Sequence, residues 1–348
     1  MAVAAICVAA LMSGCHEPVE TNSKLILQFV LPSSVSNSIH NRIMGDPGKA
    51  DCLELPHYAY IFAVFKMESG EYNIMSVIEK DLYEGKTSDS EVWVPAFTDG
   101  DIIYRCRITF SDFSLIIGQG AVDYCHVYAA MSRVPLALKM GATTVDENHL
   151  PTDEETVKNI TFTVDNALQG ELQNIYSTPY NYEIDGTYYA NLVEQKVPTN
   201  IILYHVASKV DLMWNVPDET QSEMRVTKVK AKNLFLGDSY LFKPTENIHL
   251  QFTDADGYTP ADLAGDIPGT WWAGRKYFYT IPYKTNVVGQ FPLQVDFDVL
   301  NVGLDNTYTY EMTMTSSVPE VFVPWMRGQL TFSNAPTANR SISINVDD

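Results

Sequence analysis

The residue types in this chain that could do chemistry are its cysteines, histidines and paired acids, and their spacing matters more than their number. The seven histidines are scattered, and no HExxH, GxSxG or Walker-type glycine motif occurs. No CxxC pair occurs either, so neither a zinc site nor thioredoxin-like chemistry is predicted. We therefore expect a protein that is not an enzyme and holds neither a metal nor a cofactor.

Three cysteines beyond the N-terminal region are candidates for a disulfide. Cys106 and Cys125 fall in predicted strands that follow one another, Ile102–Phe110 and Val122–Ala129. Partners across two neighbouring strands lie close enough to bridge if the register agrees, so this pair is a candidate disulfide. The alternative is that both, together with Cys52, are buried thiols.

The first fourteen residues are typical of an export signal. Residues 2–12 are uncharged and mostly apolar, and the stretch is too short for the ~20 residues that cross a bilayer. The sequence Leu11-Met12-Ser13-Gly14-Cys15 follows and resembles a bacterial lipobox, in which cleavage precedes the cysteine and its thiol carries the lipid. Cys15 is therefore the predicted lipid-attachment residue. Because no basic residue precedes Lys24, an ordinary secretory signal or a start upstream of Met1 remains the alternative.

The remainder of the chain is predicted to be β-structure. Apolar and polar residues alternate along residues 25–31, 160–164, 293–299, 308–314 and 342–346, as they do where one face of a strand is buried. Residues 58–66 and 71–78 flank the turn sequence Met67-Glu-Ser-Gly70 and predict a hairpin. Many short strands separated by polar turns indicate β-sandwiches with mostly antiparallel sheets.

Chain length and composition indicate two domains. A chain of 348 residues exceeds what one hydrophobic core usually serves. Residues 173–190 are rich in Tyr, Asn, Gly and Pro and are predicted to be a long loop, after which a strong strand begins at Ile201. We predict a signal peptide at 1–14, a tether at 15–23, an N-terminal β-sandwich at 24–195 and a C-terminal β-sandwich at 196–348.

The charge of the chain excludes some partners. The sequence carries 43 acidic against 23 basic residues, for a net charge of -20. This excess repels nucleic-acid phosphates and disfavours adsorption to an anionic bilayer.

Several motifs in order along the chain resemble the fimbrillin superfamily of Bacteroidales type V pili. Besides the lipobox, the matching segments are Ala59-Tyr-Ile-Phe-Ala-Val-Phe65, Tyr128-Ala-Ala-Met-Ser-Arg133, Tyr204-His-Val-Ala-Ser-Lys-Val-Asp-Leu212 and Gly274-Arg-Lys-Tyr-Phe-Tyr279. His205 stands where the family usually has Arg, and the Pro of the second motif is missing.

The resemblance implies two transthyretin-like β-sandwich domains and export to the outer membrane as a lipoprotein. It also implies a fimbria-like surface polymer, in which a protease cuts beyond the first strand and a strand of another fimbrial subunit fills the groove. The first strand here is Leu25–Leu31, and Arg42 is the candidate processing site. The alternative is an ordinary arginine in a solvated loop. The C-terminal motif of a major stalk subunit is not found, so a tip, accessory or anchor role is expected.

A glycan-binding lipoprotein of the outer membrane is the second hypothesis. The chain has 20 Tyr and 5 Trp, and Trp271 and Trp272 are adjacent. Neighbours on a strand point to opposite faces, so one of the two indoles could be exposed and stack on a host or microbial sugar ring. The alternative is that one packs in the core and the other under a loop. An adhesive tip subunit could combine both functions.

Overall fold

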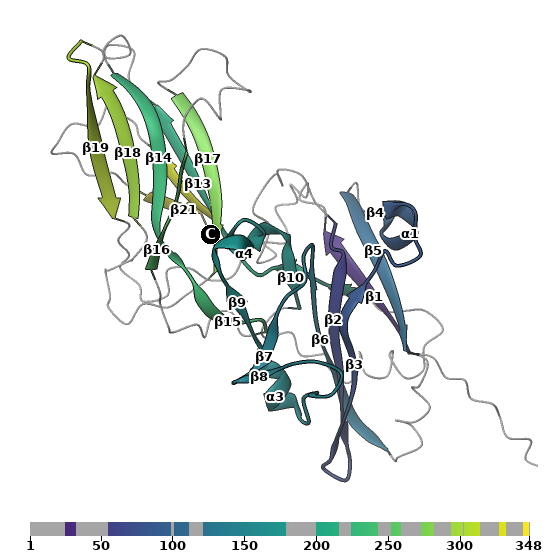
Figure 1. Cartoon of the computed structure of the whole chain (residues 1–348). Coiled ribbons are helices and arrows are strands. Elements are labelled where there is room, and N and C mark those ends of the chain that lie inside the picture. Colours follow the sequence, from purple (N-terminus) through teal and green to yellow (C-terminus); the bar gives the residue numbers. More distant parts are fainter. Residues whose placement is uncertain are drawn as a thin grey trace, which may run out of the picture.

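The computed structural model describes residues 25–32, 55–98, 101–110, 121–178, 200–215, 224–242, 252–258, 273–281, 294–301, 303–313, 327–331 and 344–347. Strands dominate these ranges, and their few helices are short (Figure 1). Nearly all strand pairs are antiparallel, so the prediction of an all-β chain with mostly antiparallel sheets is confirmed. In the same ranges, no helix has the length and apolar character needed to cross a membrane.

The first sandwich consists of two sheets. The β1 sheet has the order β11-β1-β5-β4, formed by Asn200–Ile202, Leu25–Pro32, Asp101–Phe110 and Val94–Thr98. The β2 sheet has the order β12-β10-β6-β2-β3, formed by Tyr204–His205, Ile175–Ser177, Val122–Ser132, Tyr58–Met67 and Tyr72–Asp81.

Strand β2 is buried on both of its faces, which explains why its sequence is a nearly continuous apolar run. Its alternate residues Ala59, Ile61, Ala63 and Phe65 belong to the first core, which fills the space between the β1 and β2 sheets and also contains Leu27, Phe29, Leu31, Trp93, Cys106 and Cys125. The residues between them, Tyr60, Phe62 and Val64, belong to a second core that includes Leu138, Phe162, Val229 and Phe297. The β2 sheet is therefore a shared wall between two cores.

A small sheet covers the far side of that wall. Its order is β15-β9-β7-β8, formed by Gly237–Tyr240, Thr161–Val164, Leu138–Met140 and Thr143–Thr144. The short helices α3 (Glu154–Lys158) and α4 (Asn166–Gln169) flank β9.

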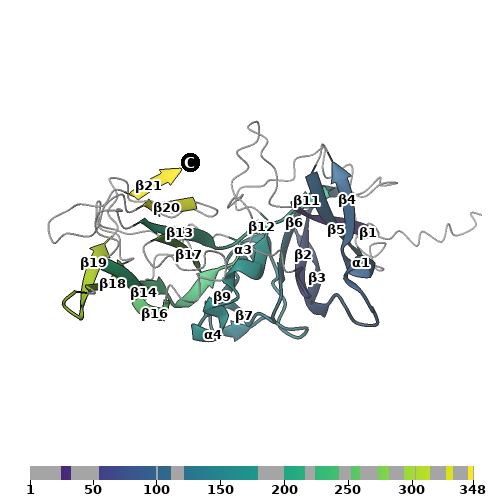
Figure 2. The ribbon, with the colours of Figure 1, turned by 90° about the horizontal axis from the view of Figure 1, so that it is seen from above.

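A second pair of four-stranded sheets lies at the opposite end of the molecule from the β1 sheet (Figures 1 and 2). One has the order β17-β13-β20-β21, formed by Ala273–Thr280, Ser208–Asn215, Arg327–Thr331 and Ile344–Asp347. The other has the order β16-β14-β18-β19, formed by Phe252–Tyr258, Met224–Phe235, Gln294–Asn301 and Asn306–Thr313.

Two short strands lie just after the domain boundary that the sequence predicts at residue 196. Strands β11 and β12 follow residue 196, yet β11 pairs with β1 and β12 pairs with β10 in the first sandwich. The segment 173–190, predicted to be a loop, contains β10, because Tyr176 and its neighbours complete the β2 sheet.

Candidate functional site

The N-terminal strand β1 occupies an internal position in its sheet rather than an edge. It pairs antiparallel with β5 from Leu25↔Phe110 to Pro32↔Ile103, and its other edge pairs parallel with β11. Its alternate side chains are almost fully buried in the first core, with exposed fractions of 1% for Leu25 and 0% for Leu27, Phe29 and Leu31. We call the place that β1 occupies the β1 seat. It consists of the pockets that hold these four side chains and of the edges of β5 and β11 that face β1.

Gln28 fixes β1 to both neighbouring strands on the face that points away from the first core. Its amide nitrogen donates to Oδ1 of Asn200 at 2.5 Å, and its oxygen accepts from Nε of Arg107 at 2.7 Å. Both partners lie on the strands that flank β1, and Gln28 pairs with each of them in the ladder. A side-chain bridge therefore reinforces the backbone register of this strand.

The candidate disulfide between Cys106 and Cys125 is not formed. Both residues are free, buried thiols. Cys106 lies on β5 of the β1 sheet, whereas Cys125 lies on β6 of the β2 sheet, so the two strands are not neighbours in one ladder. Burial raises the pKa of the Cys106 thiol to about 12, and it raises the pKa of Cys125 as well. The alternative of buried thiols describes these two residues correctly.

The other residues singled out from the sequence lie outside the described ranges. These are the lipid-attachment candidate Cys15, the processing candidate Arg42, the third cysteine Cys52 and the glycan-stacking candidates Trp271 and Trp272.

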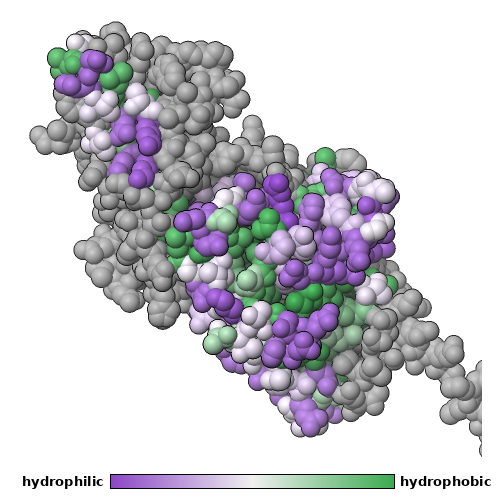
Figure 3. Space-filling view, viewed as in Figure 1, coloured by the Kyte–Doolittle hydropathy of each residue, from purple (hydrophilic) through white to green (hydrophobic). Residues whose placement is uncertain are grey.

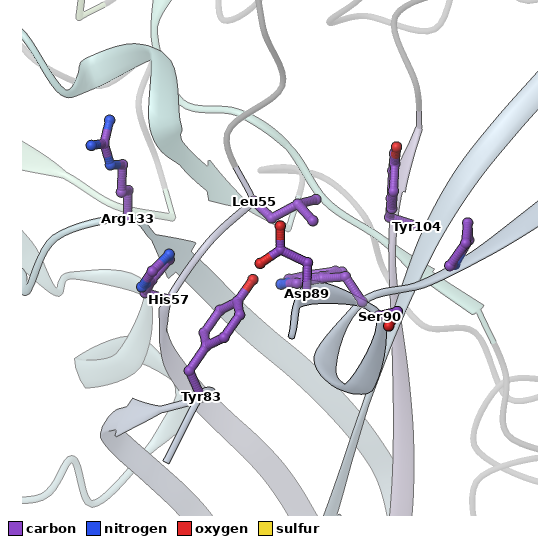
Figure 4. Close-up of a pocket in the computed structure, with 9 residues that line it drawn as sticks. Leu55, His57, Tyr83, Asp89, Ser90, Tyr104 and Arg133 are labelled. Atoms are coloured by element: carbon purple, nitrogen blue, oxygen red, sulfur yellow. The ribbon is translucent and has the colours of Figure 1, made fainter. Parts of the chain in front are cut away.

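A cavity of about 550 Å³ opens at the end of the first sandwich where β1 ends (Figure 4). It is lined from five parts of the chain: Leu55 and His57 before β2, Tyr83 after β3, the segment Asp89–Pro95, Tyr104 of β5 and Arg133 after β6. Tyr104 pairs with Leu31 in the ladder, so one wall of the cavity belongs to the β1 seat.

One aromatic pair and one buried indole shape the cavity. The imidazole of His57 stacks on the ring of Tyr83, with ring centroids 4.3 Å apart and planes inclined by 30°. The indole of Trp93 is buried beside them, and its Nε1 donates to the backbone oxygen of Pro56 at 3.0 Å. That hydrogen bond gives the buried indole N–H the partner that it needs.

The Tyr83 hydroxyl is a buried polar group of the cavity for which no hydrogen bond is found. It is buried and completes no hydrogen bond, although Figure 4 shows it directed toward the Asp89 carboxylate. Burial, and then the nearby carboxylate, raise the pKa of Tyr83. At neutral pH the group is therefore a neutral phenol with a proton to donate.

A second polar cluster, centred on Glu154, joins helix α3 to the β2 sheet. The Tyr124 and Tyr128 hydroxyls donate to its carboxylate at 2.8 and 2.6 Å, and Nδ1 of His126 lies 2.5 Å from Oε1. Burial would raise the pKa of Glu154, but the hydrogen bonds from His126, Tyr128 and Tyr124 outweigh it and hold that pKa far below its usual range. Because an ionised carboxylate only accepts, Nδ1 of His126 carries the proton.

The Glu154 cluster is a structural joint, and its polar groups are satisfied. Lys158, one turn along α3, lies 3.4 Å from the same carboxylate. In the described part of the chain, no group of three or more histidine, cysteine or acidic side chains is placed to hold a metal ion.

Sequence reasoning missed both the cavity and the Glu154 cluster. The alternation Tyr124, His126, Tyr128 was a usable signal, because three polar aromatic residues on one face of a strand indicate a polar partner.

The surface itself is polar: hydrophilic side chains cover most of the described face of the first sandwich, with apolar ones in separate groups (Figure 3).

Among known proteins, this chain resembles solved structures, whereas its sequence matches no protein-family model and no curated protein. The tip fimbrial protein Mfa3 from Porphyromonas gingivalis, solved with a C-terminal truncation, is 10% identical, with a TM-score of 0.39 over 93% of this chain and 99% of that one. A candidate cell adhesion protein from Bacteroides ovatus is 12% identical, with a TM-score of 0.40 over 93% and 95% of the two chains.

A candidate adhesin from Bacteroides ovatus is a third neighbour, 11% identical, with a TM-score of 0.37 over 93% of both chains. These three neighbours are described as adhesive or fimbrial proteins. The fold described above rests on the strand pairing of this chain itself.

Proposed function

We propose that this chain is an adhesive surface subunit of a fimbria-like polymer, assembled by strand addition and exported as a lipoprotein. The observation that carries the proposal is the β1 seat. The first strand of the chain is held between two partners, with four alternate side chains buried almost completely.

Removal of β1 would leave an opening suited to another strand. The facing edges of β5 and β11 would lose their hydrogen-bond partners, and the pockets of Leu25, Leu27, Phe29 and Leu31 would be open to water. An unpaired ladder beside a row of apolar pockets binds an added strand through its backbone, and the pockets select the register.

The position of Arg42 fits this scheme. It lies in the chain between β1 and β2, so a cut there would leave β1 attached to the domain by non-covalent contacts alone. An uncut chain would keep its own strand in place, as an anchor subunit lipidated at Cys15 would require.

The remaining parts of the proposal concern organisation and location. We assign the chain two sandwich domains that divide near residue 196, a lipid anchor on Cys15 at the outer membrane, and other fimbrial subunits as partners. The strands β11 and β12 pair with the first sandwich, and β15 pairs with β9, so strands from both sides of this division meet.

The experiment is a comparison of surface polymers. Shear fractions from cells producing the full chain should contain ladders that resist SDS and disappear on heating. Deletion of Leu25–Leu31 or of the C-terminal strand Ile344–Asp347 should abolish the ladders, while a control at an exposed residue, Glu147→Gln, leaves them intact. Unchanged ladders after both deletions would reject assembly by strand addition.

Glycan binding is the second candidate function, as an activity of the same surface subunit. The sequence suggests Trp271 and Trp272 as glycan-stacking residues, and we keep them as a proposal. If the chain is retarded in polysaccharide gels and Trp271→Ala or Trp272→Ala abolishes this retardation, the proposal is supported. The observation in the described structure that favours glycan binding is the aromatic, polar cavity at the end of the first sandwich.

A further inference from the structure

The cavity at the end of the first sandwich has the size and position of a ligand site. Its volume of about 550 Å³ lies within the ~300–1,000 Å³ usual for small-molecule sites. It lies at the end of the β-sandwich, among connecting segments, where binding residues are commonly found on a rigid scaffold.

One wall of the cavity offers an aromatic surface. His57 is exposed while it stacks on Tyr83, so the outer ring of the pair is accessible. The backbone on either side is fixed, because the His57 nitrogen donates to Ser132 and the His57 oxygen accepts from Leu82. An accessible ring on a fixed backbone can stack against the C–H face of a ligand without further ordering cost.

The polar groups around this surface are balanced in charge. Asp89 supplies a carboxylate that accepts, and the Tyr83 hydroxyl is a buried donor without a completed hydrogen bond. Arg133 stands at the rim, 4.0 Å from Glu171, with 42% of its side chain exposed. The Tyr83 hydroxyl oxygen is not accessible to water, so Asp89 and Arg133, which are both exposed, are the groups that a ligand in the cavity would meet.

These features select among ligand classes. A purely apolar ligand would remove water from the Asp89 carboxylate without replacing the hydrogen bonds of that water. A phosphorylated ligand would face the Asp89 carboxylate in a chain of net charge -20. A neutral sugar ring has an apolar face for stacking and hydroxyls that both donate and accept.

We propose that this cavity binds a neutral saccharide unit of a surface glycan. The proposal rests on the proposed adhesive function and names its ligand class and its residues: His57 and Tyr83 as the stacking pair, and the Asp89 carboxylate as the hydrogen-bond acceptor. The site is distinct from Trp271 and Trp272 in sequence.

The test is a binding measurement on the purified full chain, which needs no polymer. The probes are galactose, glucose, mannose and N-acetylglucosamine oligosaccharides on a multivalent array, followed by calorimetric titration of those that bind. Three variants address the cavity: His57→Ala removes the accessible ring, Tyr83→Phe removes one hydroxyl, and Asp89→Asn removes one charge. His149→Ala and Asp123→Asn are matched controls on exposed residues elsewhere in the first half of the chain.

The expected result is saturable binding of at least one probe that weakens about tenfold or more in His57→Ala and Asp89→Asn, with controls within roughly twofold of the parent chain. Absence of binding by every probe up to ~10 mM would overturn the proposal. Binding that survives the cavity variants, or that is lost on Trp271→Ala instead, would overturn it too. The surface-ladder experiment fails or succeeds independently, because monomeric chain suffices here.

Discussion

Phe29 of β1 lies directly opposite Cys106 of β5 in the antiparallel ladder, and both side chains are buried in the first core. The exposed fraction is 0% for Phe29 and 3% for Cys106. The strand that strand addition would remove therefore covers a free thiol, and this thiol is a natural reporter of whether the β1 seat is filled.

The first prediction uses this reporter. In a chain that lacks residues 1–15 and carries Cys52→Ser, Cys106 should react with Ellman's reagent at pH 8 at least ~100-fold faster when β1 is lost by cutting or truncation than when β1 is retained. Burial raises the pKa of Cys106 to about 12, and exposure returns it toward about 8.5. The matched control is the same truncation carrying Cys106→Ala, which isolates the contribution of Cys125. Equal rates with and without β1, in chains whose circular dichroism shows retained strands, would contradict the prediction.

The second prediction concerns packing in the β1 seat. Leu27→Ala should lower the free energy of unfolding by about 2–5 kcal/mol, because it removes a fully buried side chain and leaves a cavity. Ile26→Ala is the control, since Ile26 is partly exposed on the other face of the same strand and should cost less. Urea unfolding followed by tryptophan fluorescence measures both. A larger loss for Ile26→Ala would mean that β1 is seated in the opposite register.

The third prediction concerns the joint between α3 and the β2 sheet. Glu154→Ala should cost about 3–5 kcal/mol, because it leaves His126 and two tyrosine hydroxyls without their acceptor. Glu155→Ala, on the exposed side of the same helix, should cost less than about 1 kcal/mol. Chemical denaturation of both variants makes the comparison, and similar losses would show that the cluster is not a joint.

The fourth prediction follows from the ionisation of Glu154. Its pKa is lowered in the folded state, while its unfolded value is about 4.3. The stabilisation from this carboxylate is therefore fully present above that pH and is lost progressively as the pH falls below it. The difference in unfolding free energy between the parent chain and Glu154→Gln should be constant from pH 7 to about pH 5 and should shrink toward pH 3. A difference that grows on acidification would contradict a lowered pKa of Glu154 in the folded state.

The sequence predicts strands better than it predicts which strands meet. The alternation at residues 25–31 identified β1 because the residues that enter the first core recur at every second position, which is a local pattern. The turn at residues 67–70 identified the β2–β3 hairpin, in which Gly70 has a positive φ of 93° that favours glycine.

Pairing across sheets depends on contacts that no local pattern records. The strands of Cys106 and Cys125 follow one another in sequence, and this suggested a ladder, but the chain passes from one sheet to the other between them. The cavity combines residues from Leu55 to Arg133 in five segments, and the Glu154 cluster combines a helix with a strand that precedes it by more than twenty residues. Such sites become visible when the sheets are in place.

Strand addition, as we propose it, requires the β1 seat to accept a strand supplied by another chain. The most direct measurement is titration of the chain lacking β1 with a fluorescent peptide of residues Leu25–Pro32 and with a control peptide carrying Leu27→Asp and Phe29→Asp. We expect saturable one-to-one binding of the first peptide, protection of Cys106 on binding, and at least ~100-fold weaker binding of the second. Equal binding of the two peptides, or a folded chain that binds neither, would contradict it.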